Sequence, residues 1–571
     1  MHWRNVISGG VAALGGAVLV LWVFGAHILP PWNTGWMLSG QIGPDPVQYW
    51  LGFTFFKQSP WMWPPGLNPR WGIEVSSSIF YADSIPLLAF FFKALDPVLR
   101  VDQYWGLWLT GCGALQGWMA WRIIGLAHDP RRPDGRSGES SAQPKTTTAP
   151  VPRVLAALLL VMQPVLLNRM GGHFALGGQF LILIALWLCL TRADGWRRGL
   201  AWGVLVLAAS LIHSYLLPMV AGLWAADFLA RVADPARRRR GLAIEAPLVP
   251  GAGIFGLYLA GFFALRGGFG GTWGGYGHMQ LDLLAPFSAG VWSRFLPAIP
   301  EPDHLEIGHS TPGLGGLLLI GLGVWAAWPR ARAIWRAHWP LILACFGMWV
   351  LAVTHRVSIA GHVLELFTLP ARVDALADAL RASERFFWPA LYAALLGAVL
   401  ALLRRVGPAR ASAVLGVLLL VQFADLQPGF ARLARYFAPP ASVVPLRLHD
   451  PFWLEATTRY DRIRLVPTDM QAAWWEEVAV LAATRGLETD AVYLARIDPA
   501  RVAAVNSDMA RRLGTGDWEP RTLYVLGDEG AIALARASHD PARDLIAEFN
   551  LVWVLAPGWF SGPGNAAPAS R

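Results

Sequence analysis

The sequence predicts an α-helical polytopic membrane protein with a small C-terminal α/β domain outside the cytoplasm. The chain of 571 residues is 55% hydrophobic and only 15% charged, whereas a soluble protein usually has about 25% charged residues. Its apolar residues gather in long segments, and its arginines fall in short clusters between them. After Asp425 the hydropathy falls, and short apolar runs begin to alternate with helical patterns.

The membrane part is expected over residues 1–430. A spanning helix needs about 20 apolar residues, and about eleven segments approach this length. We expect the first of them to be retained, because it is longer than the apolar region of a signal peptide. The segments lie near 6–29, 102–126, 153–169, 174–191, 199–214, 215–233, 244–265, 313–329, 339–354, 386–403 and 411–427.

The basic loops predict the orientation, because such loops stay in the cytoplasm. With a cytoplasmic N-terminus all the clusters fall on one side, and an odd number of spans places the C-terminus outside. We therefore expect a bacterial inner-membrane protein, and we explain the net charge of +9 by topology rather than by nucleic-acid binding. The clusters contain Arg4, Arg131, Arg132, Arg136, Lys145, Arg197, Arg198, Arg237 to Arg240, Arg330, Arg332, Arg336, Arg404 and Arg405.

The connections also carry information. The first extracytoplasmic loop, 30–101, is far longer than an ordinary connection, and such loops are usually functional. Its segment 78–99 is apolar, but spanning there would break the arginine alternation, so we expect a re-entrant or interfacial helix. The linker 128–150 is rich in Pro, Ser, Thr and Gly and is expected to be a disordered cytoplasmic loop.

Residues 431–571 are expected to form the small α/β domain. Apolar runs alternating with helical patterns indicate a largely parallel sheet. The expected strands lie at 463–467, 491–495, 522–526 and 551–555, and the expected helices at 472–485, 499–513 and 528–537.

Two acids in the first loop are candidate catalytic residues. Asp45 lies between prolines before a predicted helix, so it is either an N-cap or a general base whose pKa is raised near the low-dielectric interface. Asp83 lies in an apolar segment, where an unpaired charge is costly. It is either a second catalytic acid or the acceptor of a buried structural hydrogen bond.

Other polar residues fall at the expected extracytoplasmic ends of the spans. An arginine there either binds a phosphate through bidentate hydrogen bonds or extends to lipid headgroups. Cofactors and metal ligands are unknown: a divalent metal is compatible with the sequence, but no ligand spacing such as H-E-x-x-H supports one. The candidate substrate-binding residues are Arg169, His173, His213, Tyr215, Arg381 and Arg385.

Several passages in residues 1–430 resemble a bacterial membrane family of unknown function whose architecture is similar to that of the GT-C glycosyltransferases. These passages are Asp45-Pro-Val-Gln-Tyr-Trp-Leu-Gly-Phe-Thr-Phe-Phe, Ser78-Ile-Phe-Tyr-Ala-Asp-Ser-Ile-Pro-Leu-Leu-Ala, Leu115-Gln-Gly-Trp and Arg381 to Pro389. GT-C enzymes use polyprenyl-phosphate-linked sugars and place an acid in the first external loop. The resemblance therefore implies Asp45 as the catalytic residue, although the chain has no clear Asp-x-Asp pair.

The resemblance implies a glycosyltransferase that moves a sugar from a polyprenyl-phosphate donor to a glycan or protein acceptor outside the cytoplasm. Membrane lipids are the other expected partners. A transporter would show broken helices at the bilayer midplane and repeated halves, and neither is evident. A non-catalytic scaffold in cell-envelope polysaccharide assembly is the remaining alternative.

Overall fold

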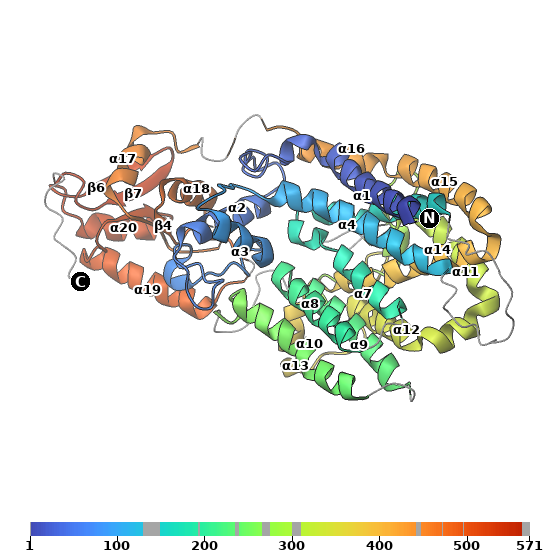
Figure 1. Cartoon of the computed structure of the whole chain (residues 1–571). Coiled ribbons are helices and arrows are strands. Elements are labelled where there is room, and N and C mark those ends of the chain that lie inside the picture. Colours follow the sequence, from blue (N-terminus) through green and yellow to red (C-terminus); the bar gives the residue numbers. More distant parts are fainter. Residues whose placement is uncertain are drawn as a thin grey trace. The chain divides into compact units, whose positions relative to one another are not determined.

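The computed structural model describes residues 2–128, 149–191, 195–234, 239–264, 275–299, 310–440, 443, 447–470, 472–494 and 496–561 (Figure 1). The chain divides into two compact units. One, the helical unit, contains 1–30, 104–255 and 273–438, and the other, the sheet unit, contains 31–103, 256–272 and 439–571. The predicted linker 128–150 lies almost wholly outside the described residues.

Each of the eleven predicted apolar segments contains an α-helix. The helices are α1 (His2–Phe24), α4 (Trp105–Ile124), α5 (Pro150–Val161), α6 (Pro164–Met170), α7 (Phe180–Leu190), α8 (Trp196–Ile212), α9 (Leu216–Val232), α10 (Arg239–Leu259), α11 (Gly313–Ala327), α12 (Ala331–Val353), α14 (Trp388–Val406) and α15 (Pro408–Asp425). The helix α16 (Gln427–Tyr436), the hairpin of β1 (Arg356–Ile359) and β2 (His362–Glu365), and the short helix α13 (Ala371–Ala377) complete the described secondary structure of this unit, apart from 3₁₀ turns.

Five of the described helical segments are long and apolar enough to cross a membrane, or six if α5 and α6 form one bent span. These two helices meet at an angle of 52°. The break lies before Pro164, because proline lacks the N–H group that a continuous helix would need there. The helix α7 has 11 residues, which is about half the length of a spanning helix.

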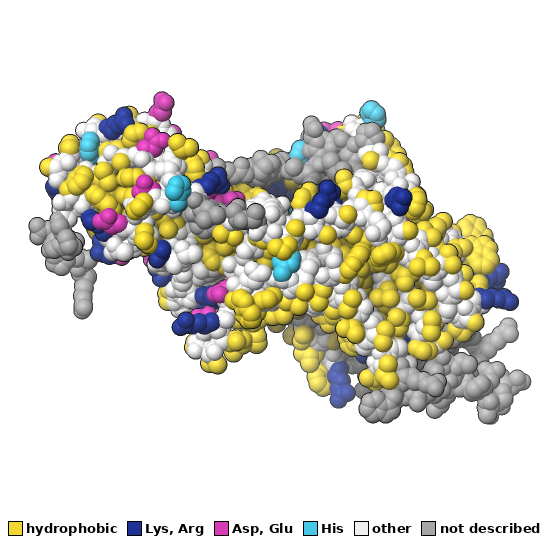
Figure 2. All heavy atoms as spheres, turned by 90° about the horizontal axis from the view of Figure 1, so that it is seen from above, with side chains coloured by type: hydrophobic (Ala, Val, Ile, Leu, Met, Phe, Trp, Pro, Cys, Tyr) yellow, Lys and Arg dark blue, Asp and Glu magenta, His cyan; other side chains and the backbone are white. Residues whose placement is uncertain are grey.

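Small residues bring α1 and α4 close together. A Cβ atom on Gly16 would collide with the backbone of Gly113, and one on Gly117 would collide with the backbone of Ala12. Gly113 and Gly117 are four residues apart on α4, which is the spacing that lets membrane helices approach closely. Apolar side chains remain exposed on α1, and Figure 2 shows many such side chains over the helical part of the chain, as expected for a lipid-facing surface.

The segment 78–99 contains a single α-helix, α3 (Pro86–Leu95). At 1.5 Å per residue its 10 residues extend about 15 Å, half of the roughly 30 Å that a hydrocarbon core requires. The helix is therefore too short to span a membrane, and its re-entrant or interfacial position stays a prediction. The longer helix α2 (Asp45–Gln58) precedes it in the same unit.

The sheet unit contains a five-stranded sheet of order β4-β3-β5-β7-β6. Its strands are β3 (Arg462–Val466), β4 (Glu488–Thr489), β5 (Thr522–Leu526), β6 (Leu545–Phe549) and β7 (Val552–Ala556). Its helices are α17 (Pro451–Arg459), α18 (Trp475–Arg485), α19 (Pro499–Thr515) and α20 (Glu529–Ser538).

The expectation of a largely parallel sheet is wrong, because the sheet is mixed. β3 is parallel to β4 and β5, whereas β7 is antiparallel to β5 and β6. The unexpected strand β6 joins β7 through Asn550 and Leu551, both with positive φ, which is the geometry of a tight hairpin turn. The strand expected at 491–495 is also wrong over its described residues 491–494, since β4 ends at Thr489.

The first loop is part of the folded sheet unit. The N–H group of Gly72 donates to the carbonyl of Thr489 at 2.8 Å, and the N–H group of Thr489 donates to Arg70 at 3.1 Å. Val75 also belongs to the same apolar core as Leu526. The loop therefore covers the β4 edge of the sheet and contributes to its core.

A buried arginine also connects the first loop to the sheet. Arg464 on β3 is fully buried and forms ion pairs with Glu74 at 2.7 Å, Glu519 at 2.6 Å and Asp490 at 3.2 Å. Burial opposes the charge of Arg464, but these three carboxylates together raise the pKa of its guanidinium.

Candidate functional site

The two candidate acids lie in segments of the sheet unit that pack against each other. Asp45 is the first residue of α2, and Asp83 lies in the turn before α3 with a positive φ of 52°. The side-chain amide of Gln48 donates to the carbonyl of Tyr81 at 3.2 Å, and the hydroxyl of Ser84 donates to the carbonyl of Tyr49 at 3.0 Å. The fold thus brings the start of α2 next to the turn that carries Asp83, and both acids are half-buried.

Asp45 can be compared with two other Asp-Pro pairs at helix starts. Asp450 and Asp498 are true N-caps, and their carboxylates accept hydrogen bonds from the first turns of α17 and α19. In α2 the cap position is Pro44, and Asp45 is already helical. A carboxylate in the first turn still interacts favourably with the helix dipole.

The neighbourhood of Asp83 is largely dehydrated. Burial raises the pKa of Tyr81, two residues earlier, to about 12. The Tyr81 hydroxyl donates to the carbonyl of Phe262 at 2.7 Å. This tyrosine therefore stays neutral at physiological pH and serves as a structural donor beside the acid.

In the helical unit, two of the predicted arginines are buried beside aromatic rings. Arg169, in the last turn of α6, is 3% exposed, and its guanidinium carbon lies 5.9 Å from the centre of the Trp388 ring. Arg385 is 6% exposed and lies 4.7 Å from the centre of the Tyr215 ring. We call these four residues the arginine–aromatic cluster.

Tyr215 positions this cluster through its hydroxyl group. The hydroxyl accepts a hydrogen bond from the N–H group of Ala382 at 2.9 Å, so the turn between α8 and α9 is tied to the segment that precedes α14. His213 supports the same turn, because its Nδ1 accepts from the N–H group of Tyr215 at 3.0 Å. This bond identifies the tautomer of a neutral His213 as the one protonated at Nε2.

The remaining two predicted residues lie next to these segments. Arg381 is half-buried and directly precedes Ala382, and its N–H group donates to the carbonyl of Asp378 at 3.3 Å. His173 is half-buried at the start of a 3₁₀ turn, four residues after Arg169. All six candidate binding residues thus belong to the helical unit, whereas the two candidate acids belong to the sheet unit.

Sequence reasoning missed a group of buried charges in α8, α9 and α10. Arg198 was interpreted as a topology signal, but its Nε donates to Oδ2 of Asp227 at 2.9 Å. Arg231 lies 3.0 Å from Asp227 and donates to Oε2 of Glu245 at 2.8 Å. Asp227 and Glu245 lie inside apolar segments, where a charge requires a partner, so these two acids could have indicated the buried ion pairs.

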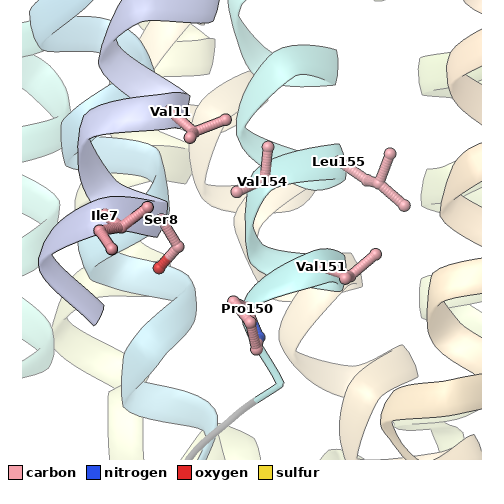
Figure 3. Close-up of a pocket in the computed structure, with 7 residues that line it drawn as sticks. All are labelled: Ile7, Ser8, Val11, Pro150, Val151, Val154 and Leu155. Carbon is pink, nitrogen blue, oxygen red and sulfur yellow. The ribbon is translucent and has the colours of Figure 1, made fainter. Parts of the chain in front are cut away.

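Two further features bear on the chemistry of the chain. Among the described residues, no three His, Cys, Asp or Glu side chains are arranged to hold a metal ion. The sequence stretch His304 to His309 lies outside these residues. A groove of about 390 Å³ between α1 and α5 has an apolar lining in which Ser8 is the only polar residue, so it offers a hydrocarbon surface and no reactive group (Figure 3).

Several candidate spans and a mixed-sheet unit define a multi-pass membrane protein with a folded C-terminal region. The chain belongs to the family described as "Domain of unknown function (DUF6311)", which matches residues 13–427. The "DUF6311 C-terminal domain" matches residues 452–557. The prediction of a membrane family of unknown function is therefore confirmed, and no curated protein matches the chain.

The chain is similar to two solved structures from Archaeoglobus fulgidus. The first is the archaeal oligosaccharyltransferase AglB in complex with an inhibitory peptide and a dolichol-phosphate, with 12% identity, a TM-score of 0.45, and coverage of 98% of this chain and 75% of that one. The second is an oligosaccharyltransferase tethered to an acceptor peptide, with 12% identity, a TM-score of 0.39, and coverage of 97% and 75%.

Proposed function

We propose that this protein is a membrane glycosyltransferase that takes a sugar from a polyprenyl-phosphate donor and transfers it to a glycan or protein acceptor outside the cytoplasm. The arginine–aromatic cluster is the observation that carries this proposal. A guanidinium can stack its face on an aromatic ring while the N–H groups in its plane bind a phosphate. Two such side chains, Arg169 and Arg385, are buried in the helical unit, where a donor with a lipid tail would be held.

The acids supply the second part of the proposal. Transfer to a hydroxyl or amide acceptor requires removal of a proton as the new glycosidic bond forms and the bond to the donor phosphate breaks. Asp45 would accept this proton as general base. Asp83, in the turn packed against α2, would act as the second acid of the site.

The membrane topology that we propose follows from the distribution of arginines along the chain. The chain would cross a bacterial inner membrane eleven times, with the N-terminus in the cytoplasm and residues 431–571 as an external domain. Each of the eleven predicted segments contains a helix, and five or six of the described helical segments are long and apolar enough to cross a membrane. A reporter fused after Arg571 should then be active only in the periplasm, and a reporter inserted near Ser140 only in the cytoplasm; activity of the C-terminal fusion in the cytoplasm would contradict the eleven-span topology.

The decisive experiment is Asp45→Asn in a strain where deletion of the protein alters an envelope glycan. Asparagine retains most of the local hydrogen bonding but cannot act as a base, and loss of a general base costs about 100-fold to 10,000-fold in rate. We expect normal accumulation of the variant and loss of the glycan. The matched control is Asp450→Asn, which makes the same change in another Asp-Pro pair of the same unit.

An unchanged glycan in the Asp45→Asn strain would reject the catalytic role of Asp45 and favour the non-catalytic scaffold. A transporter would likewise tolerate this substitution. Mass spectrometry of the purified protein addresses the donor independently, because the proposal requires a co-purifying polyprenyl-phosphate lipid. If extracts of the purified protein contain only bulk phospholipids, the donor assignment fails.

A further inference from the structure

The β1–β2 hairpin buries a polar residue and exposes large apolar residues. Its register pairs Ser358 with Val363 and Val357 with Leu364. Opposite residues of an antiparallel pair share one face, so these two pairs lie on opposite faces of the hairpin. On the first face Ser358 is fully buried, and its hydroxyl donates to Oδ2 of Asp282 at 2.7 Å, whereas its partner Val363 is 38% exposed.

The opposite face exposes large apolar side chains, together with His362, which is paired with Ile359. Leu364 is 64% exposed and Ile359 is 49% exposed. Leu366 and Phe367, directly after β2, are also exposed. A hairpin on a water-facing surface has the reverse arrangement, with apolar residues inside and polar residues outside.

The carboxylate of Asp282 anchors the hairpin, together with the N–H group of Leu283, which donates to the carbonyl of Ser358 at 2.9 Å. Asp282 accepts hydrogen bonds from the N–H groups of Ala360 and Gly361, each at 3.2 Å, in addition to the bond from Ser358. Ala360 and Gly361 both have positive φ, which is the geometry of a two-residue hairpin turn. The buried anchor therefore fixes which face points away from the protein.

The apolar face continues a lipid-facing stripe. The helix α12 belongs to a candidate membrane span that ends at Val353, three residues before β1 begins. Near this end of α12, Leu343, Phe346 and Val350 are exposed at helical spacing, so they form one apolar stripe. After the hairpin, α13 adds the exposed pair Val373 and Leu376.

We propose that the outer face of the β1–β2 hairpin, defined by Ile359, Leu364 and Leu366, lies on the surface of the lipid bilayer at the end of α12. Its occupant is the boundary between lipid headgroups and acyl chains. A lipid surface suits this face because it accepts apolar side chains without a matching shape, and because the face continues the stripe of a spanning helix. The hairpin is then a membrane-seated element that holds the connection between α12 and α14 close to the bilayer.

The test uses the full-length protein in lipid nanodiscs, with an environment-sensitive fluorophore on a cysteine introduced by Leu364→Cys. The matched control is Glu365→Cys, because Glu365 is the next residue of β2, faces the other side, and has a side chain that is 49% exposed. Leu366→Cys gives a second probe of the apolar face if the first variant fails to fold. Labelling of the unsubstituted protein measures the background from its own cysteines, of which Cys112 and Cys345 are buried.

We expect the probes at 364 and 366 to emit at shorter wavelength than the probe at 365, to be quenched by doxyl-labelled phosphatidylcholine, and to be protected from aqueous iodide. The probe at 365 should show the opposite behaviour. Equal iodide quenching at all three positions would overturn the proposal. Protection of 364 without lipid quenching, together with crosslinking between two copies, would also overturn it and identify a protein interface.

Discussion

Two pairs of buried arginines in the helical unit have different surroundings, and the comparison distinguishes a structural role from the proposed binding role. In the first group, Arg198 and Arg231 are hydrogen-bonded to Asp227 and Glu245, so two positive charges meet two negative charges. Trp202 completes this network by donating to Asp227 at 2.9 Å. Such a network neutralises its own charges and links α8, α9 and α10.

In the second group, Arg169 and Arg385 have aromatic neighbours. The guanidinium carbon of Arg169 lies 5.9 Å from the centre of the Trp388 ring, and that of Arg385 lies 4.7 Å from the centre of the Tyr215 ring. We interpret the first group as structural, because its carboxylates link three helices. The second group is the proposed phosphate site, because a guanidinium beside an aromatic ring can bind a phosphate through its N–H groups. The following predictions test this distinction, from the largest expected effect to the smallest.

Asp227→Asn should have the largest effect on stability. It removes one carboxylate from both Arg198 and Arg231, and breaking a buried ion pair costs about 3–5 kcal/mol. Thermal unfolding of the purified protein in detergent should show a large drop in midpoint. Glu455→Gln is the control, since it breaks the exposed pair of Glu455 and Arg459, which contributes less than about 1 kcal/mol; equal shifts in the two variants would refute the structural assignment.

Arg385→Lys should leave the unfolding midpoint nearly unchanged but weaken retention of polyprenyl phosphate. Lysine keeps the charge and loses the planar fork, and one charge-assisted hydrogen bond contributes about 1.5–3 kcal/mol, or roughly tenfold or more in affinity. Quantitative lipid mass spectrometry measures the effect. Arg405→Lys is the control, because Arg405 lies 5.5 Å from the Trp325 ring near the C-terminus of α14. The same loss of lipid in both variants would argue against a specific phosphate site.

Tyr215→Phe should have a moderate effect. It keeps the ring beside Arg385 but removes the acceptor of the Ala382 N–H group, which contributes about 1 kcal/mol. We expect a small decrease in unfolding midpoint and a decrease in lipid retention. Tyr392→Phe removes a hydroxyl that donates to Gln179 at 2.6 Å, so it should lower stability alone. If lipid retention falls equally in both variants, Tyr215 has no special role.

Low pH should weaken the hydrogen bonds through which Asp282 holds the β1–β2 hairpin. Burial raises the pKa of Asp282, but hydrogen bonds from Ser358 and from the N–H groups of Leu284, Gly361 and Ala360 lower it more, so the folded pKa lies below its ordinary value. The stabilisation is therefore present above the unfolded pKa of about 3.9 and disappears as the pH falls through the folded pKa.

The protection of the amides of residues 354–366 against hydrogen exchange, relative to the intrinsic exchange rate at each pH, should accordingly stay high down to about pH 4 and fall at lower pH. Asp282→Asn should exchange faster already at neutral pH, because it removes the charge that Ser358 and the turn amides stabilise. Unchanged exchange in this variant would show that the anchor contributes little.

The positions of the apolar helices could be predicted from the sequence because apolar length is a local property. All eleven predicted segments contain helices, and five or six of the described helical segments are long and apolar enough to cross a membrane. The interfacial position of 78–99 stays a prediction. The mixed sheet was missed because β6 has a half-exposed pattern without strong alternation, and because its pairing with β7 depends on a turn at Asn550. The role of the first loop in the sheet unit depends on contacts between residues hundreds of positions apart, which no local pattern encodes.

The candidate site was predictable in part. The aromatic and basic residues of the segment from Arg381 to Pro389 indicated a special region, and the structure brings Arg385 of this segment to Tyr215. The packing of Trp388 near Arg169 was not predictable, because it depends on how α6 and α14 pack. The catalytic roles of Asp45 and Asp83 remain predictions.

The ion pair between Glu74 and Arg464 has a consequence for biosynthesis. The two residues are 390 positions apart, so at about 5–20 residues per second the ribosome adds Arg464 roughly 20–80 s after Glu74. During this interval the intervening membrane helices are made and inserted while the first loop waits without its partner. The first loop is then exposed to proteases until its partner segments are made. Its fold can be completed only during the last quarter of translation.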